Sequence, residues 1–245
     1  MAQPAVLTLL GGFELRLGRR LVELAPGAER VVAYVALHGG PASRANVAGN
    51  LWPEMREERA LANLRSALWR LRQHGVRIVV AHGDRVSLAP TVSVDFVDLR
   101  SAARGFLDGR IPGDNAELDR LVAGGELLGD WYDEWVFTER EQFRQLRLQA
   151  LERMAVELAA GMHFGRAAET ALAAVTTEPL RESAQRALIA VHLAQGNRSE
   201  AIRQYCAYRK LVRDELDLEP SQQMADLIGS VPRATIERVY RSLAS

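Results

Sequence analysis

Partial alternation of hydrophobic and polar residues marks both ends of the first ninety positions and predicts short β-strands there. Residues 6–17 alternate in part and, after a turn of glycine and arginine, residues 21–24 form a second short strand. Residues 77–80 and 86–88 flank a Gly-Asp turn, which predicts a β-hairpin. The first ninety residues therefore begin and end in antiparallel β-structure.

Three helices are predicted between these strands, because apolar residues repeat there at helical spacing. The first runs from Glu29 to His38, and the second runs from Arg44 to Leu51 behind Ser43, a residue type that caps helix N-termini. The third runs from Glu57 to His74 and ends at Gly75. Strands, three helices and a terminal hairpin, in this order, are typical of a winged helix-turn-helix whose third helix enters the DNA major groove.

Beyond residue 93 the pattern is helical throughout. Two helix-loop-helix segments resemble each other: Ala160-Gly161 is matched by Gln195-Gly196, 35 residues later, and Ala167 by Ala201, 34 residues later. A period near 34 residues with small residues at helix crossings is typical of tetratricopeptide (TPR) repeats. Helices are predicted over residues 96–106, 116–122, 135–160, 166–175, 181–194, 199–215, 221–228 and 235–243.

The fold class that follows is mainly α, with two domains. A chain of 245 residues is long enough for two. We predict that residues 1–92 form an α+β winged helix-turn-helix DNA-binding domain. Residues 93–245 are predicted to form an all-α, TPR-like helical bundle.

The predicted third helix has an apolar side and a polar side. The apolar side consists of Leu61, Leu64, Leu68 and Leu71. The opposite side carries side chains that hydrogen-bond to base edges or phosphates, namely Arg59, Asn63, Ser66, Arg70 and Gln73. We interpret it as the DNA-binding face, and the alternative is an ordinary solvated helix surface. Trp69 lies at its border, either as a DNA contact or as a residue that packs against the hairpin or the second domain.

Further candidate contacts lie around that face. Arg65 and Arg72 lie nearer the apolar edge and are predicted to contact phosphates rather than bases. Arg44, at the start of the second helix, is another candidate phosphate contact. His82 and Arg85 flank the hairpin turn, where a wing side chain can enter a minor groove or contact the backbone. His82 is equally well explained as a loop residue without a function.

The charge of the chain is balanced overall but unequally distributed. Its formal net charge is +0 at pH 7. Residues 1–90 nevertheless contain 12 arginines against seven acidic residues, whereas residues 91–245 contain 19 basic residues against 24 acidic ones. Such an asymmetry indicates that one half meets a polyanion. Arginine codon bias in a GC-rich genome would produce part of the same signal.

No enzymatic or metal-binding motif is present in the sequence. The five histidines show no HxxxH or HExxH spacing, and the single cysteine, Cys206, has no second thiol for a disulfide or a zinc site. Phosphate-binding glycine loops and a nucleophile elbow are also missing. An acidic cluster at residues 130–134 is explained as a capped helix start packed by tryptophans. We expect no catalytic residue, no metal, no cofactor and no membrane partner, and an intracellular protein.

Several segments resemble a known family of regulators. In the first half they are Leu51-Trp52-Pro53, Ala62-Asn63-Leu64-Arg65 and Leu68-Trp69-Arg70-Leu71-Arg72. In the second half they are Val94-Asp95-Phe96, Gly129-Asp130-Trp131 with Trp135, Glu139-Arg140, Pro179-Leu180-Arg181-Glu182, Glu200-Ala201 with Tyr205, Asp214-Glu215-Leu216 and Leu218-Glu219-Pro220. Their order and spacing resemble the SARP family of actinobacterial transcription activators, which join an OmpR-type winged helix to a bacterial transcriptional activator domain.

That resemblance implies an activator function. SARP proteins bind direct repeats in the major groove upstream of promoters and recruit RNA polymerase holoenzyme, its sigma factor and core subunits, to genes of secondary metabolism. The resemblance also implies a homodimer on tandem repeats of double-stranded DNA. One departure is the wing, which reads Gly83-Asp84-Arg85-Val86 where the family usually has a Gly-Tyr pair.

The loop before the third helix is where OmpR-type domains contact polymerase. Here it provides Trp52, Glu54, Glu57 and Glu58 as candidate polymerase contacts. An equally good interpretation of the acids is that they stabilise the positive N-terminus of the third helix.

A second hypothesis makes the protein an interaction module. In that case a groove of the TPR-like domain binds a peptide through residues such as Tyr205 and Tyr208, and the winged domain serves as a scaffold. The polar face of the third helix would then be dispensable.

Overall fold

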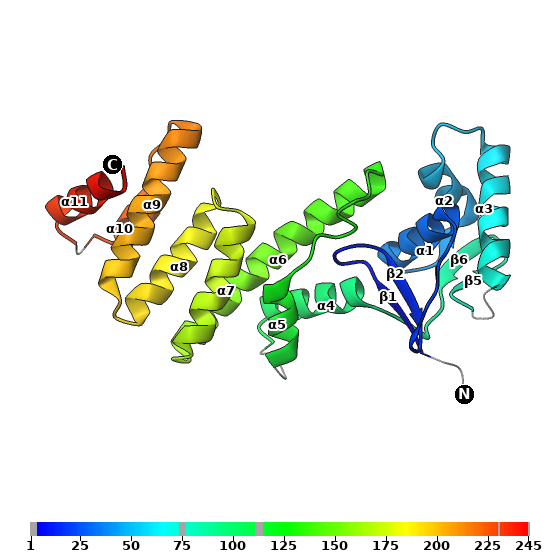
Figure 1. Cartoon of the computed structure of the whole chain (residues 1–245), viewed down its shortest axis with the longest axis horizontal. Helices are drawn as coiled ribbons and strands as arrows, with labels where there is room; N and C mark the ends of the chain where they lie inside the picture. The colour runs from blue at the N-terminus through cyan, green and yellow to red at the C-terminus, as the bar shows by residue number, and fades with distance from the viewer. Residues whose placement is uncertain (1–3, 74–76, 111–114, 230, 245) are drawn as a thin grey trace. The chain divides into compact units, whose positions relative to one another are not determined.

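The computed structural model describes residues 4–73, 77–110, 115–229 and 231–244. Its contacts divide the chain into two compact units, residues 1–102 with 124–144 and residues 103–123 with 145–245. This division differs from a boundary after residue 92, because residues 124–144 pack on the first unit rather than the second. The predicted fold class is confirmed: a small α+β unit comes first and a helical unit follows (Figure 1).

A mixed sheet opens the first unit. Strands β1 (Ala5–Thr8), β2 (Glu14–Leu17) and β3 (Arg20–Leu21) are antiparallel neighbours, and β7 (Val92–Val94) pairs in parallel with β1. Alternate residues of β1 and β2 are buried, as the pattern predicted. The strand predicted over residues 21–24 is shorter than expected. Strand β7 was not predicted, because three residues carry almost no periodicity and its partner lies far away in the sequence.

Most helix ends of the first unit lie where the sequence predicts, but the first helix begins at Pro26, three residues before the predicted Glu29, because proline is favoured in the first turn of a helix. Helix α1 (Pro26–His38) ends at Gly39, which adopts a left-handed φ of 70° that glycine tolerates best. Helix α2 (Arg44–Leu51) begins at Ser43, whose hydroxyl accepts a hydrogen bond from the Asn46 amide. Helix α3 (Glu57–Gln73) begins as predicted, and its predicted end at His74 and Gly75 lies outside the described residues.

The predicted hairpin is present and gains a third strand. Strands β5 (Val79–His82) and β6 (Arg85–Leu88) pair across Gly83, which has a φ of 59°. Strand β4 (Ala42–Ser43), between α1 and α2, pairs with β6, so the strand order is β4-β6-β5. The hairpin is thereby joined to the start of α2, and the Arg44 amide donates a hydrogen bond to the Asp84 carbonyl at 2.7 Å.

Residues 124–144, here called the returning segment, complete the first unit. The Leu128 amide donates to the Leu9 carbonyl at 2.9 Å, and the Gly11 amide donates to the Glu126 carbonyl at 2.8 Å. Side chains reinforce this pairing through a series of ring contacts that runs from Phe13 to Trp131, Trp135 and Tyr34. The sequence predicted a helix start packed by tryptophans here, and the structure shows that these tryptophans pack against Phe13 and Tyr34 of the first unit.

The second unit is built from helices. Helices α4 (Asp95–Leu107) and α6 (Glu134–Ala160) each begin in the first unit and end in the second. The second unit also contains α5 (Asn115–Ala123), α7 (Phe164–Thr177), α8 (Glu182–Ala194), α9 (Arg198–Leu216), α10 (Gln222–Leu227) and α11 (Arg233–Ala244). Consecutive helices α7, α8 and α9 pack as neighbours (Figure 1), and Ala167 and Ala201 are fully buried as the repeat predicted.

Candidate nucleic-acid interface

Helix α3 is held by its apolar side. It packs on α1 and α2, and Leu64, Leu68 and Leu71 are buried as predicted. The buried stripe differs from the prediction at its start, because Ala60 is buried whereas Leu61 is only half-buried. A small residue lies at this position because α3 contacts two helices at once and their backbones approach closely.

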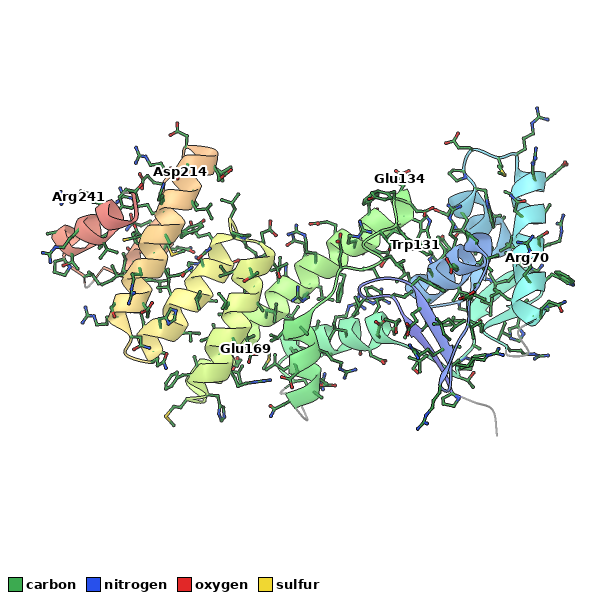
Figure 2. The ribbon with its side chains drawn as sticks, viewed as in Figure 1. Arg70, Trp131, Glu134, Glu169, Asp214 and Arg241 are labelled. Atoms are coloured by element: carbon green, nitrogen blue, oxygen red, sulfur yellow. The ribbon has the colours of Figure 1, made fainter. Side chains whose placement is uncertain are left out.

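The polar side of α3 faces solvent along most of its length. Arg59, Ser66, Arg70 and Gln73 are exposed, and Arg70 extends from the outer side of the helix (Figure 2). Asn63 is half-buried, and its Nδ2 lies 3.1 Å from the Met55 sulfur in the loop before α3. Four of the five predicted base-contacting residues therefore share one open surface, and the fifth contacts the preceding loop.

The residues beside this face are also accessible. Arg65 and Arg72 are exposed. Trp69 is 61% exposed, so the alternative in which it packs against the hairpin is wrong. A largely exposed tryptophan next to arginines presents a flat apolar surface that can contact a sugar or a base. Its role in binding DNA stays a prediction.

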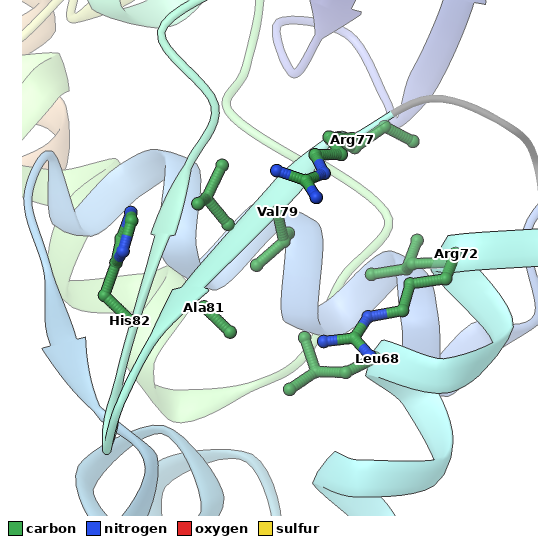
Figure 3. A pocket seen from close by; sticks show the side chains of 9 residues that line it. Leu68, Arg72, Arg77, Val79, Ala81 and His82 are labelled. Carbon is green, nitrogen blue, oxygen red and sulfur yellow. The ribbon is translucent and has the colours of Figure 1, made fainter.

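A groove separates the end of α3 from the hairpin. It has a volume of about 470 Å³ and lies between Leu68, Leu71 and strand β5. Arg72 from α3 and Arg77 from the base of the hairpin both extend over it, and His82 lies at its far end (Figure 3). Arg77 was not among the predicted site residues. Its position directly before the apolar residues of a strand is the only sequence signal that it carried.

The wing residues are positioned by the hairpin register and by a contact with the residue before β4. Arg85 lies opposite His82 in the β5–β6 register, and its Nη1 donates to the Pro41 carbonyl at 3.3 Å. His82 and Arg85 are exposed, whereas Arg44 is half-buried beside the turn. The Arg44 Nε has no hydrogen-bond partner among the described residues. The structure thus places all three side chains near the hairpin turn.

The loop between α2 and α3 projects its acids outward. Glu54 is exposed in the loop, and Glu57 and Glu58 are exposed in the first turn of α3. Trp52 is half-buried at the C-terminus of α2, close to Gly27 of α1. Both interpretations of the acids fit this geometry, because two of them lie at the helix N-terminus and one does not.

The arginines of α3 differ in their pairing from those of the helical unit. Arg59, Arg65 and Arg70 of α3 form no ion pair with any described residue. Arginines of the helical unit mostly have a carboxylate partner, as in Arg153–Glu157, Arg181–Glu152, Arg203–Glu200 and Arg213–Glu219. The first set therefore presents uncompensated positive charge on one surface, which favours a polyanionic partner.

The residues that carry the family resemblance in the second half have structural roles. Asp95 accepts the Leu9 and Leu10 amides at 2.8 and 3.2 Å. Arg140 donates to the carbonyls of Leu127, Leu128 and Trp131. The Asp95 contacts fasten the start of α4 to the residues that follow β1, whereas the Arg140 contacts hold the returning segment in its own conformation. They are positioning contacts rather than a reactive centre, and no cluster of metal-ligating residues occurs in the described part of the chain.

The two tyrosines proposed for a peptide groove are largely buried. Tyr208 is 4% exposed, and burial raises its pKa to about 12. Tyr205 is 9% exposed and lines a cavity of about 380 Å³ between α9 and the following helices. Neither ring is therefore presented on an open groove. Among the described residues, no helix is long and apolar enough to cross a bilayer.

Comparison with known proteins gives consistent matches. The family model "Bacterial transcriptional activator domain" matches residues 108–231. The regulatory protein AfsR of Streptomyces griseus is 26% identical over 244 residues, 94% of this chain, and that of Streptomyces coelicolor is 28% identical over 222 residues, 86% of this chain. These alignments cover 25% and 22% of the relatives, so this chain spans about a quarter of their length.

The fold also matches a solved structure. The Mycobacterium tuberculosis protein EmbR, solved in complex with a low affinity phosphopeptide, aligns with a TM-score of 0.71 at 18% sequence identity. The alignment covers 99% of this chain and 69% of EmbR, so the likeness extends over both units. Since the family model covers half of the chain and the motif residues of both halves occur in the family's order, the protein belongs to the SARP family of bacterial transcriptional activators.

Proposed function

We propose that this activator binds double-stranded promoter DNA through α3 and the β5–β6 hairpin. The observation that supports the proposal is the uncompensated arginine surface of α3, directly beside an exposed tryptophan and a groove flanked by Arg72 and Arg77. In this arrangement α3 enters the major groove. Arg59, Ser66, Arg70 and Gln73 face base edges, and Arg44, Arg65, Arg72 and Arg77 face phosphates.

The remaining parts of the proposal concern the promoter. The protein binds direct repeats as a homodimer and recruits RNA polymerase holoenzyme, for genes of secondary metabolism. The exposed acids Glu54, Glu57 and Glu58, together with Trp52, form the surface offered to a basic region of the sigma factor or a core subunit. This surface lies at the N-terminal end of α3, so it stays accessible while the polar side of the helix contacts DNA.

A selection experiment tests DNA binding. The purified full chain is incubated with random DNA duplexes at about 0.1–0.2 M salt, and the bound fraction is sequenced. We expect enrichment of a tandem repeat whose half-sites are about one helical turn apart, 10–10.5 base pairs. Failure of the folded protein to enrich any sequence would contradict the proposal.

A pair of variants connects that result to α3. Arg70→Ala should weaken binding by about 1–3 kcal/mol and relax one position of the motif if Arg70 contacts a base, or weaken all sequences alike if it contacts phosphate. The Asn63→Ala Arg70→Ala double variant should lose the enriched motif. Arg203→Ala is the matched control, because Arg203 is an exposed arginine on α9 of the helical unit, where no DNA contact is proposed. Circular dichroism confirms that each variant is folded.

A further inference from the structure

The helical unit contains a cavity that the proposed function does not use. It has a volume of about 620 Å³ and lies between the end of α4, α5, α6 and α7. Its floor is apolar, because Phe106, Leu118 and Met154 are 1%, 2% and 4% exposed. Cavities that bind small molecules typically measure about 300–1,000 Å³ and have mostly apolar walls. The size and floor of this cavity fit that description.

Three arginines lie at the rim of the cavity. Arg110, Arg153 and Arg166 line it, against a single lining carboxylate, Glu157. The guanidinium group of Arg110 lies 5.1 Å from the centre of the Phe106 ring, so a positive group adjoins the apolar floor. Each rim arginine also has a carboxylate partner, namely Glu117 for Arg110, Glu157 for Arg153, and Asp119 with Glu169 for Arg166.

The contacts of these arginines leave hydrogen-bond donors available. Arg153 Nε donates to Glu157 at 3.0 Å and Arg110 Nη1 to Glu117 at 2.8 Å, each using part of its guanidinium group. Arg166 uses Nη1 for Asp119 at 2.5 Å, whereas its Nη2 is closed off from solvent and has no partner within the described residues. A buried guanidinium nitrogen without an acceptor is costly, so an added acceptor would be stabilising.

We propose that this cavity binds a small amphiphilic organic anion, with its apolar chain on the floor and its carboxylate at the arginine rim. A purely polar anion would fit the cavity less well, because it would leave the apolar floor without an apolar partner. The rim favours an anion over a neutral apolar molecule, because a carboxylate accepts charge-assisted hydrogen bonds from arginine. The site lies wholly in the helical unit and does not depend on the proposed DNA contacts.

Methionine methyl groups provide a local readout of binding. The chain contains five methionines, of which Met154 forms part of the cavity floor, Met55 lies in the first unit and Met224 lies in α10. The full chain, labelled with ¹³C at the methionine methyl groups, is titrated with sodium octanoate and, separately, with octanol. The Met154 signal is assigned with Met154→Leu. We expect a saturable shift of the Met154 signal with octanoate, while the Met55 and Met224 signals stay in place.

Charge variants test the role of the rim. Arg153→Gln and Arg166→Gln should weaken octanoate binding by about fivefold to tenfold and leave octanol binding nearly unchanged. Arg203→Gln, outside the cavity, is the control and should bind octanoate like the original chain. The proposal is overturned by the absence of a saturable Met154 shift up to about 1 mM octanoate. Equal affinity for octanoate and octanol, or parallel shifts at Met55 and Met224, would overturn it as well.

Discussion

At the scale of single residues, a few polar side chains hydrogen-bond to several backbone groups outside regular helices and strands. Arg140 donates to three backbone carbonyls of the returning segment, at 2.8, 2.5 and 3.0 Å. Asp95 accepts the amides of Leu9, Leu10 and Phe96. Backbone amides that are removed from water need a hydrogen-bond acceptor. The Asp95 carboxylate accepts from amides that would otherwise need the carbonyl groups of a neighbouring strand.

Replacement of Asp95 should therefore destabilise the first unit. Asp95→Ala leaves the Leu9 and Leu10 amides without their acceptor and should lower the free energy of unfolding by about 2–4 kcal/mol. Asp95→Asn keeps one carbonyl oxygen and should cost less. All four tryptophans lie within residues 1–102 and 124–144, so tryptophan fluorescence during urea denaturation follows this unit. Asp98→Ala, at an exposed position of the same helix, is the control. If both variants lose the same free energy of unfolding, the Asp95 hydrogen bonds do not stabilise the unit.

At the scale of elements, the winged unit presents α3, the hairpin and the α2–α3 loop as three adjacent surfaces. The helix offers arginines, the hairpin base offers Arg77, and the loop offers acids. The opposite charges of helix and loop favour different partners, a nucleic acid for the first and a basic protein surface for the second. Two glutamates of this region also lie in the first turn of α3, where the helix dipole stabilises them.

Glu54 separates the two interpretations of the acidic residues. It lies in the loop and not in the first turn of α3, so it contributes little to the stability of the helix. We expect Glu54→Lys to lower activated transcription in a purified system several-fold while leaving the affinity for the operator unchanged. Glu58→Lys should lower transcription and also destabilise α3 by about 0.3–1 kcal/mol. If Glu54→Lys activates transcription normally, Glu54 is not part of a polymerase contact.

At the scale of the whole molecule, a net charge of zero conceals two unlike halves. The positive excess of residues 1–90 is matched by a negative excess in residues 91–245. The arginines of the helical unit are largely paired with carboxylates, whereas those of α3 are not. Binding to DNA should therefore depend on the charge of the first unit rather than on the net charge of the chain.

The dependence of DNA affinity on salt measures this effect. The logarithm of the binding constant should fall linearly with the logarithm of salt concentration, with a slope of about −0.9 for each phosphate contacted. Arg77→Gln should reduce the magnitude of that slope by about 1 and weaken all sequences alike, because Arg77 is proposed to contact phosphate. Arg203→Gln serves as the control and should keep the original slope. An unchanged slope in Arg77→Gln would remove Arg77 from the interface.

The local structure of the protein was predicted well because it depends on neighbouring residues. The start of α2 at the Ser43 cap, the end of α1 at Gly39 and the buried leucines of α3 follow from capping chemistry and helical period. The same local pattern placed arginines on the open side of α3. These features are determined by the sequence itself, since the interactions that set them span only a few positions.

Only the tertiary structure decided how distant segments meet. It paired β7 with β1, brought residues 124–144 back to the winged unit, moved Asn63 toward Met55 and placed Arg77 beside Arg72. It also left a cavity with three arginines at its rim where four helices of the second unit approach one another. None of these contacts repeats along the chain with a period. The pairing of β7 with β1 and the return of residues 124–144 join residues far apart in sequence, and the contacts of Asn63 and Arg77 lie outside the helix and strand periods, so local patterns encode none of them.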